Sequence, residues 1–179
     1  MFYTRKGDDG SSGLFGQDTR CNKDHPIFHA LGTVDELNSL LGVCYAKAQL
    51  EEQSENIPIP DILRRVQEDL FIIQAELAGA SKHVSNEHVL RLEGIIADIE
   101  VHIKNPNGFV ISGSNELSAF LDFARSVARR AEREVLRADA QSSVSKDLHI
   151  YLNRLSSLLY VLARFSADIA DVKEQNPSY

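Results

Sequence analysis

Cysteine is scarce in this chain: Cys21 and Cys44 are the only two, and they stand far apart in the sequence. There is no CxxC pair, and no nearby set of histidines and cysteines has the spacing of a zinc site. These absences predict a reduced compartment and a fold without a structural metal.

Long apolar runs are also missing. The chain opens with MFYTRKGDD, which has no apolar core of a signal peptide, and no later run is long enough to span a bilayer. Acidic residues come too early for a typical organelle transit peptide. We therefore expect a cytoplasmic protein with no membrane partner.

Positive charge is in deficit, with 19 Lys and Arg against 26 Asp and Glu, for a formal net charge of −7. Nucleic acids and anionic membranes both require a broad positive surface, so neither is expected as the main partner. With 179 residues and 43% hydrophobic content, the chain can bury the core of one globular domain. We predict a single domain over 1–179, with a flexible tail from about 172.

Several catalytic signatures are absent from the sequence. It has no Gly-x-Ser-x-Gly elbow and no Cys/His nucleophile set. It also lacks the Glu-x-x-His pairs that a di-iron helical bundle uses, which argues against that class. The chemistry of the chain must therefore come from groups that bind and orient ligands.

What the sequence does contain is helical periodicity. Five segments carry apolar residues at helical spacing, and only one short apolar segment, 109–114, could be a strand. The pattern predicts an all-α five-helix bundle with antiparallel neighbours. The expected helices begin at Thr33, where Thr33 to Glu36 form a capping box, at Asp61, at Ser85, at Ser114 with Leu117, and after the polar stretch 140–145.

The N-terminal segment 4–16, TRKGDDGSSGLFG, is rich in glycine, with Gly7, Gly10, Gly13 and Gly16 three residues apart. Glycines let backbone N–H groups turn toward an oxyanion, and hydroxyl side chains add donors. The segment could therefore cradle phosphate, or be a loop without function. It is not a Walker loop, and its two aspartates, Asp8 and Asp9, could instead help to hold a divalent cation.

The most unusual stretch is 124–133, ARSVARRAER, which has four arginines. In a helix Arg125, Arg129 and Arg133 share one face, where like charges oppose the helix unless an anion lies opposite. Arginine suits bidentate contact with carboxylate or phosphate. The alternative is a solvated face with Glu132 and Glu134 as partners.

Two further polar features bear on this face. Asp35, at the start of the first predicted helix, could be a helix-dipole residue or a partner for the arginines. In the fifth predicted helix Asn153 and Arg154 interrupt an apolar neighbourhood and need partners, because unpaired buried polar groups are costly. Together, these groups predict a helical site for a nucleotide polyphosphate.

Four segments in this order resemble the PduO-type ATP:cob(I)alamin adenosyltransferases: YTRKGDDGSSGLFG, GTVDELNSLLG from Gly32, ARSVARRAERE from Ala124 and YLNRLSSLLYVLAR from Tyr151. The resemblance implies a homotrimer with active sites between subunits. It implies transfer of the 5′-deoxyadenosyl group of ATP, bound with Mg²⁺, to the Co(I) centre of a reduced cobalamin, with release of triphosphate. A hand-off of the product to an adenosylcobalamin-dependent enzyme would follow.

The resemblance also implies roles for single residues. Arg129 would contact the triphosphate, Arg125 would pair with Asp35 at the subunit interface, and Phe109 would help to displace the lower axial ligand of cobalt. The magnesium ion would be held mainly by the ATP phosphates. Surrounding the nucleotide would be Thr4, Gly7, Asp8, Gly10, Ser11, Ser12, Lys23, Arg130, Glu132 and Asn153.

The chain departs from the family pattern at three places. Ile27 replaces a usual arginine, Ser12 a usual threonine, and Ile111 to Ser114 the usual Leu-Pro-Gly-Gly. Ser12 keeps a hydroxyl, whereas Ile27 removes a cation. These departures leave open an alternative, a catalytically silent member that binds ATP or adenosylcobalamin and serves as a sensor or delivery module.

Overall fold

The computed structural model describes residues 2–16, 18–51, 54, 56–104, 106, 108–140 and 144–179. Within them lie five helices, which confirms the predicted all-α bundle, and one short hairpin. The elements in chain order are β1 (Ser11–Gly13), β2 (Arg20–Asn22), α1 (Pro26–Ala48), α2 (Ile59–Leu77), α3 (Asn86–Glu100), α4 (Glu116–Asp139) and α5 (Lys146–Ile169).

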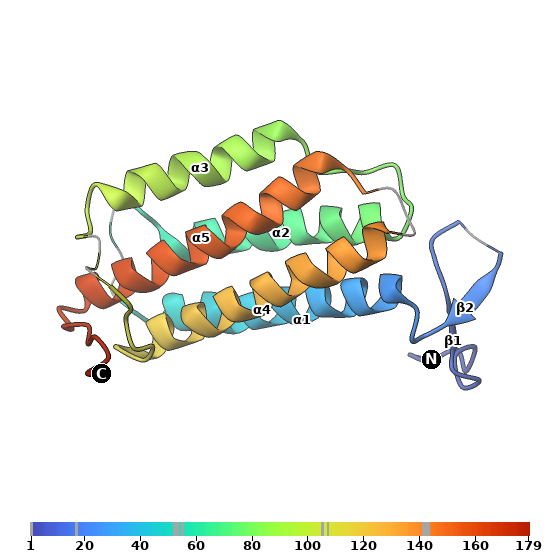
Figure 1. Ribbon diagram of the computed structural model, residues 1–179, viewed down its shortest axis with the longest axis horizontal. Helices are drawn as coiled ribbons and strands as arrows, with labels where there is room; N and C mark the ends of the chain where they lie inside the picture. Colours follow the sequence, from blue (N-terminus) through green and yellow to red (C-terminus); the bar gives the residue numbers. More distant parts are fainter. Residues whose placement is uncertain are drawn as a thin grey trace.

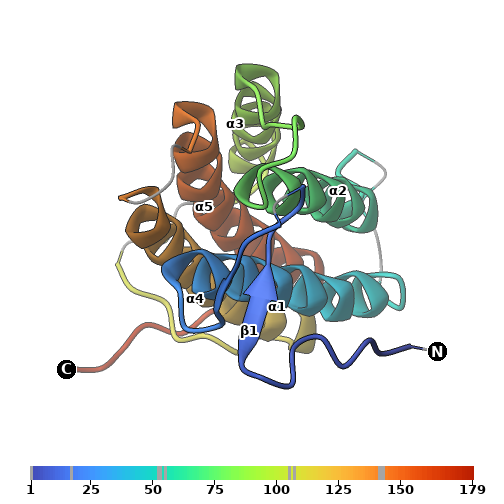
Figure 2. The ribbon, with the colours of Figure 1, turned by 90° about the vertical axis from the view of Figure 1, so that its right-hand side faces the viewer.

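The helices pack in a chain of neighbours: α2 on α1, α1 on α4, α4 on α5, and α5 on α3 (Figure 1, Figure 2). Helices that follow each other in sequence run in opposite directions, as predicted. Helices α3 and α5, which are not consecutive in the sequence, pack side by side and run in the same direction. Sequence order alone does not reveal this pairing, since α4 separates the two helices in the chain.

Helix α1 begins seven residues before the predicted start. Pro26 occupies its first turn, where a proline costs no hydrogen bond, and the His25 ring accepts from the Ile27 N–H at 3.3 Å. Thr33, expected to cap the helix, lies inside it and donates its hydroxyl to the His29 carbonyl at 2.7 Å. The predicted capping box is therefore wrong.

The other helix starts agree with the sequence to within three residues. Ser85 caps α3 and Ser145 caps α5, where its hydroxyl accepts from the Leu148 N–H at 3.2 Å. Helix α4 is capped by Asn115 instead of Ser114, and α2 begins at Ile59 instead of at Asp61. The predicted connector 140–145 lies partly outside the described residues.

The core runs the length of the bundle and is built from the apolar stripes of all five helices. Leu41, Leu70, Leu121 and Leu155 are among its fully buried side chains. It also contains one buried polar cluster, in which Asp69 of α2 accepts from Tyr151 of α5 at 2.8 Å and from Arg91 of α3 at 2.5 Å. This cluster ties three helices together.

The segment 109–114, which the sequence left open between a strand and a loop, is a loop before α4, whereas the chain before α1 contains the hairpin of β1 and β2. The tail after 171 carries hydrogen bonds to this loop, from Ile111 N–H to the Gln175 carbonyl and from Asn176 to the Phe109 carbonyl, both 2.8 Å. The flexibility of the tail stays a prediction. Among the described residues, none of the helices is apolar enough over a sufficient length to cross a membrane.

Candidate active site

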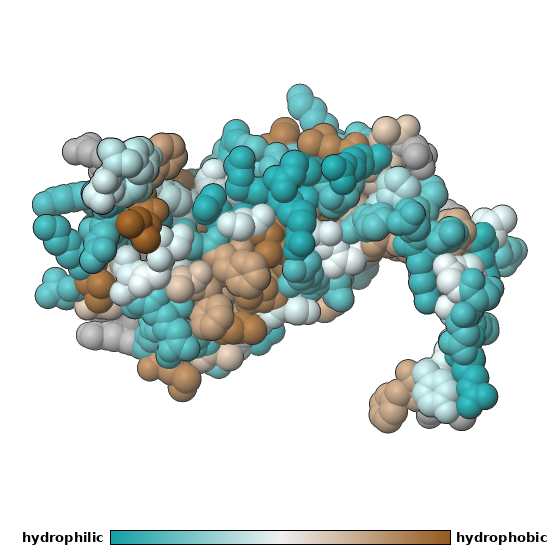
Figure 3. All heavy atoms as spheres, turned by 60° about the horizontal axis from the view of Figure 1, so that its bottom comes forward, coloured by the Kyte–Doolittle hydropathy of each residue, from teal (hydrophilic) through white to brown (hydrophobic). Residues whose placement is uncertain are grey.

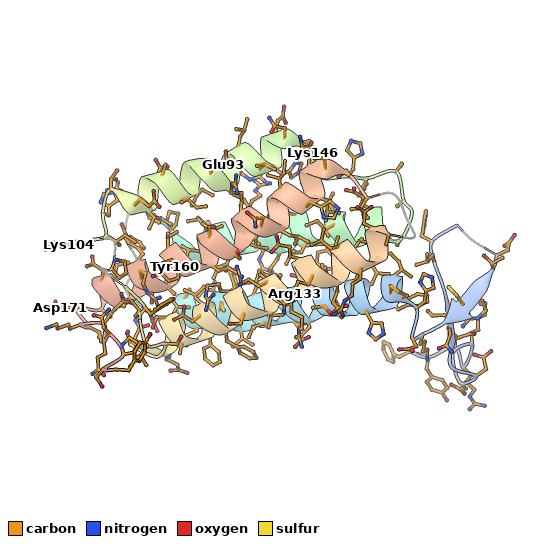
Figure 4. All side chains as sticks on the ribbon, viewed as in Figure 1. Glu93, Lys104, Arg133, Lys146, Tyr160 and Asp171 are labelled. Carbon is orange, nitrogen blue, oxygen red and sulfur yellow. The ribbon has the colours of Figure 1, made fainter. Side chains whose placement is uncertain are left out.

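A cavity of about 630 Å³ opens between α3, α4 and α5. One wall is apolar, with Ile96 and Ile103 from the α3 side and Val161 from α5. The α4 wall carries Arg125 and Arg129, one turn apart. Tyr160 lies on α5, between α3 and α4 (Figure 4). The cavity therefore combines apolar area with positive charge, as a large amphipathic ligand with an anionic partner requires.

A buried carboxylate holds the arginines of this wall. Asp122 is 4% exposed and accepts from the Arg164 guanidinium at 2.6 Å, while the Arg125 Nε lies 3.7 Å from its other oxygen. Arg164 is itself 4% exposed, and its guanidinium lies over the Tyr160 ring, 4.9 Å from the ring centre. Because both charges of the Asp122–Arg164 pair are hydrogen-bonded, this wall is rigid and polar at its base.

Arg129 is exposed, and its side chain reaches the cavity. Its carbonyl accepts from Arg133, at 2.9 Å, so the Arg133 guanidinium is turned back along the helix. The like charges predicted to repel on this face are therefore not aimed at one another. Arg129 remains available to an anion from outside the chain.

A polar network continues along α4 and α5 beside the cavity. Asn153 donates to Glu132 at 3.0 Å and accepts from Arg154 at 2.9 Å, and Arg154 reaches Glu93 of α3 at 2.7 Å. Both residues of the polar pair thus have partners, although Asn153 is exposed and does not lie in the apolar seam of α5. Farther out, Arg130 forms an ion pair with Glu36 of α1.

The N-terminal hairpin is a second polar assembly. Lys23 donates to the Gly7 carbonyl at 2.8 Å, and its backbone N–H bonds the Gly10 carbonyl at 2.9 Å. Gly10 has φ +79°, a left-handed conformation that glycine adopts without strain. A Cβ on Gly7 would come within 3.0 Å of the Lys23 Nζ, so the backbone approaches this cation closely. The predicted loop residues and Lys23 are thus brought together.

Arg20 holds this assembly, and the sequence did not single it out. Its guanidinium donates to the Ser11 hydroxyl at 2.8 Å, to the Ser11 carbonyl at 2.9 Å and to the Lys6 carbonyl at 2.7 Å. The Ser11 hydroxyl and N–H in turn donate to Asp9, and these hydrogen bonds lower the pKa of Asp9. Asp9 is therefore occupied in shaping the hairpin.

The hairpin and the cavity lie apart in the single chain. The hairpin projects from the end of the bundle where α1 begins, whereas Tyr160 lies toward the other end of α5 (Figure 1, Figure 4). Thr4, Ser12 and Lys23 therefore do not line the cavity that contains Arg129. The two groups of residues predicted to share a site are therefore separated within one chain.

The family profile for cobalamin adenosyltransferases matches residues 2–166. The chain belongs to the cobalamin adenosyltransferase family. It is 37% identical over 182 residues to the corrinoid adenosyltransferase PduO of Salmonella typhimurium, and 31% identical over 185 residues to the corrinoid adenosyltransferase MMAB of Bos taurus. These alignments cover 97% and 98% of this chain.

The chain spans about half (51%) the length of the PduO relatives from Salmonella typhimurium and Citrobacter freundii. A shorter corrinoid adenosyltransferase from Citrobacter freundii, also 37% identical, is covered over 97% of its length. The family domain therefore occurs both with and without additional sequence.

Solved structures of the family share the fold. A phenylalanine-to-alanine variant of the PduO-type ATP:corrinoid adenosyltransferase from Lactobacillus reuteri, complexed with cobalamin and ATP, superposes with a TM-score of 0.88 at 25% identity, covering 97% of both chains. An arginine-to-lysine variant of that protein, complexed with ATP, also gives 0.88, at 25% identity over 99% of this chain and 100% of that one.

Some predicted family contacts fall outside what one chain contains. Asp35 is exposed on α1 and accepts from Gln74 of α2 at 3.2 Å, while Arg125 faces Asp122. The predicted Arg125–Asp35 pair is thus not formed within the chain, and a pair between subunits stays a prediction. Phe109 is 76% exposed on the loop before α4, so it does not serve as core packing.

Sequence reasoning missed three residues beneath and beside the α4 wall of the cavity. Asp122, Arg164 and Tyr160 are ordinary members of helical patterns, and the first two are 42 positions apart. The only signal of Asp122 and Arg164 was charge at positions that the apolar periodicity places inside. Among the described residues, no cluster of three or more histidines, cysteines or carboxylates could hold a metal.

Proposed function

We propose that this protein transfers the 5′-deoxyadenosyl group of ATP to the Co(I) centre of a reduced corrinoid such as cobalamin, forming adenosylcobalamin and releasing triphosphate. The observation that carries the proposal is the cavity whose apolar wall faces Arg125 and Arg129 in a member of this family. A corrin ring suits the apolar side, and a polyphosphate suits the guanidinium groups.

The reaction balances without a protein nucleophile. The electron pair of Co(I) attacks C5′ of ATP, the cobalt–carbon bond forms, and the C5′–O bond breaks with its pair leaving on triphosphate. The hard chemistry belongs to the corrinoid, so the protein supplies proximity and charge stabilisation. Arg129 would stabilise the negative charge that develops on the leaving triphosphate.

ATP would enter as its Mg²⁺ complex. The magnesium ion would be held mainly by the ATP phosphates. The N-terminal segment carries donors for such a complex in the Lys23 ammonium and the hydroxyls of Thr4 and Ser12, while the Ser11 hydroxyl donates to Asp9. Asp8, Gly7 and Gly10 belong to the same turn.

The active unit would be a homotrimer in which the hairpin of one subunit meets the cavity of the next. The projection of the hairpin away from its own bundle supports this. So does an α1–α4 apolar patch, formed by Leu40, Val43, Phe120 and Phe123, of which Phe123 is 56% exposed. Apolar side chains gather on the face of α1 and α4 shown in Figure 3. Such a contiguous patch is typical of an interface between subunits.

The decisive experiment measures the change in cobalamin absorbance that accompanies formation of the cobalt–carbon bond. Purified protein is mixed anaerobically with MgATP and chemically reduced cobalamin. We expect conversion well above the rate without protein, with triphosphate released in equal amount. Folded protein that binds ATP by calorimetry and gives no conversion, beside an active control enzyme, would identify the silent binding module instead.

A further inference from the structure

The chain after α5 turns back onto the bundle. Asp171 has φ +51°, a left-handed conformation, and the Val172 N–H bonds the Ala167 carbonyl at 3.0 Å. Asp171 lies at the same end of the bundle as Lys104, just after α3 (Figure 4). The turn therefore directs the tail toward the end of the bundle from which the loop 108–114 departs.

Three consecutive tail residues, 174–176, make specific contacts there, and we call them the C-terminal latch. Gln175 accepts from the Ile111 N–H at 2.8 Å, and the Asn176 side chain donates to the Phe109 carbonyl at 2.8 Å. The two bonds fix the backbone of the loop on both sides of Val110. Among the residues that the structure describes, these two hydrogen bonds hold the loop to another part of the chain.

The third latch residue reaches the base of the cavity. Glu174 forms an ion pair with Arg164, whose other partner is Asp122, and Asp122 faces Arg125. Two carboxylates thus balance two guanidinium groups beneath the α4 wall. Partial burial raises the pKa of Glu174, an effect that the charge of Arg164 opposes. Without Glu174 the wall would carry one uncompensated positive charge.

The loop 108–114 needs the contacts of the latch because its own side chains do not anchor it in the core. Phe109 is 76% exposed and Ile111 is 50% exposed, so neither is anchored by packing in the core. Gly108 and Gly113, with φ of +122° and +109°, leave the flanking backbone free to adopt other conformations. The position of Phe109 therefore depends on the latch.

We propose that the C-terminal latch positions Phe109 at the corrinoid side of the active site, with Glu174 and Asn176 as positioning residues and Arg164 as their anchor. This inference rests on the proposed function and on the role that the family resemblance implies for Phe109. It assigns a mechanical task to the tail: it joins the loop that meets the corrinoid to the wall that meets the triphosphate.

The first measurement is independent of activity. Hydrogen exchange of the Ile111 amide is compared between the wild type and Asn176→Ala, Glu174→Gln and the double variant, with Ser178→Ala as a tail control. We expect the exchange to be about fivefold faster in each single variant and faster still in the double, as the loss of one net hydrogen bond implies. Unchanged exchange in the double variant would overturn the latch.

The second measurement uses turnover. In Asn176→Ala we expect the KM for cobalamin to rise several-fold and the KM for ATP to stay within about twofold, because the Asn176 side chain contacts the loop and not the α4 wall. Equal changes in both constants would show a general structural role and overturn the positioning claim. If the wild type has no turnover, the proposed function fails, whereas the exchange data still decide whether the latch exists.

Discussion

At the scale of single residues, Arg129 differs from its neighbours because no hydrogen bond or ion pair of its side chain is described in the chain. Arg125 faces Asp122, Arg130 pairs with Glu36, and Arg133 bonds a backbone carbonyl. The four arginines look alike in sequence, yet three have structural contacts. The one that reaches the cavity with its charge uncommitted is the one suited to a ligand.

We therefore expect Arg129→Ala to lower kcat for adenosyl transfer by roughly 10²- to 10³-fold, the usual effect of removing a group that stabilises developing charge. Arg129→Lys should lower kcat less than Arg129→Ala does, but its kcat should stay below that of the wild type, because lysine cannot make the bidentate contact. The midpoint of thermal unfolding should hardly change. Arg65→Ala, at an exposed pair on α2, is the matched control. Wild-type turnover in Arg129→Ala would remove Arg129 from the mechanism.

Tyr151 makes the opposite kind of contribution, to stability. It is fully buried, and burial raises the pKa of its hydroxyl well above the ordinary value, so it remains a donor to Asp69. Tyr151→Phe should lower the free energy of unfolding by about 1–3 kcal/mol, because the buried carboxylate loses a donor. Chemical denaturation measures this. Tyr179→Phe, which is exposed, should leave the unfolding midpoint unchanged, and equal midpoints for both variants would mean that Asp69 does not need the hydroxyl.

At the scale of elements, the sequence predicts helices well where the apolar periodicity and the capping residue indicate the same helix start. Ser85 and Ser145 each precede a clear apolar stripe, and both cap helices. At α1 two start signals compete, Pro26 and the Thr33 box. The earlier one prevails because Ile27 and Ala30 are buried against the core, a tertiary gain that local pattern does not reveal.

The junction of α4 and α5 depends on one carboxylate. Asp139 accepts from the Val144 N–H at 2.8 Å and lies 3.0 Å from the His149 ring, and these contacts lower the pKa of Asp139 below 3.8. A carboxyl group whose pKa is lower in the folded state than in the unfolded state stabilises the fold at pH values above its unfolded-state pKa. That stability is lost as the pH falls through the folded-state pKa.

Asp139→Asn should therefore be less stable than the wild type at pH 6, by up to about 1 kcal/mol for a partly exposed group. The difference should shrink as the pH falls below about 4, the ordinary pKa of Asp, and disappear once the pH has fallen through the lowered folded-state pKa of Asp139. Urea unfolding between pH 6 and pH 3 tests this, with Asp61→Asn in the first turn of α2 as the control. A difference that stays constant across this range would exclude Asp139 as the titrating group.

At the scale of the whole molecule, the candidate site could be predicted only as parts. The glycine segment, the arginine helix and Asn153 are each visible in the sequence, and each is formed in the structure. These parts do not meet within one chain, because the hairpin projects away from the cavity of its own bundle. Asp122 and Arg164 were also beyond sequence reasoning, because their pairing depends on how α4 packs on α5.

A site shared between subunits predicts complementation. Lys23→Ala should disable the hairpin half, and Arg129→Ala the cavity half, so each homotrimer alone should be nearly inactive. When the two proteins are unfolded together and refolded at equal amounts, a site that takes its hairpin from one subunit and its cavity from the next is intact in about one quarter of cases. The refolded mixture as a whole should thus recover about 25% of wild-type turnover. Lys23→Ala refolded with a Lys23→Ala/Arg129→Ala double variant is the control and should stay inactive. If the mixture of single variants is equally inactive, both halves must come from one chain, and the hairpin would then have to fold back onto its own bundle.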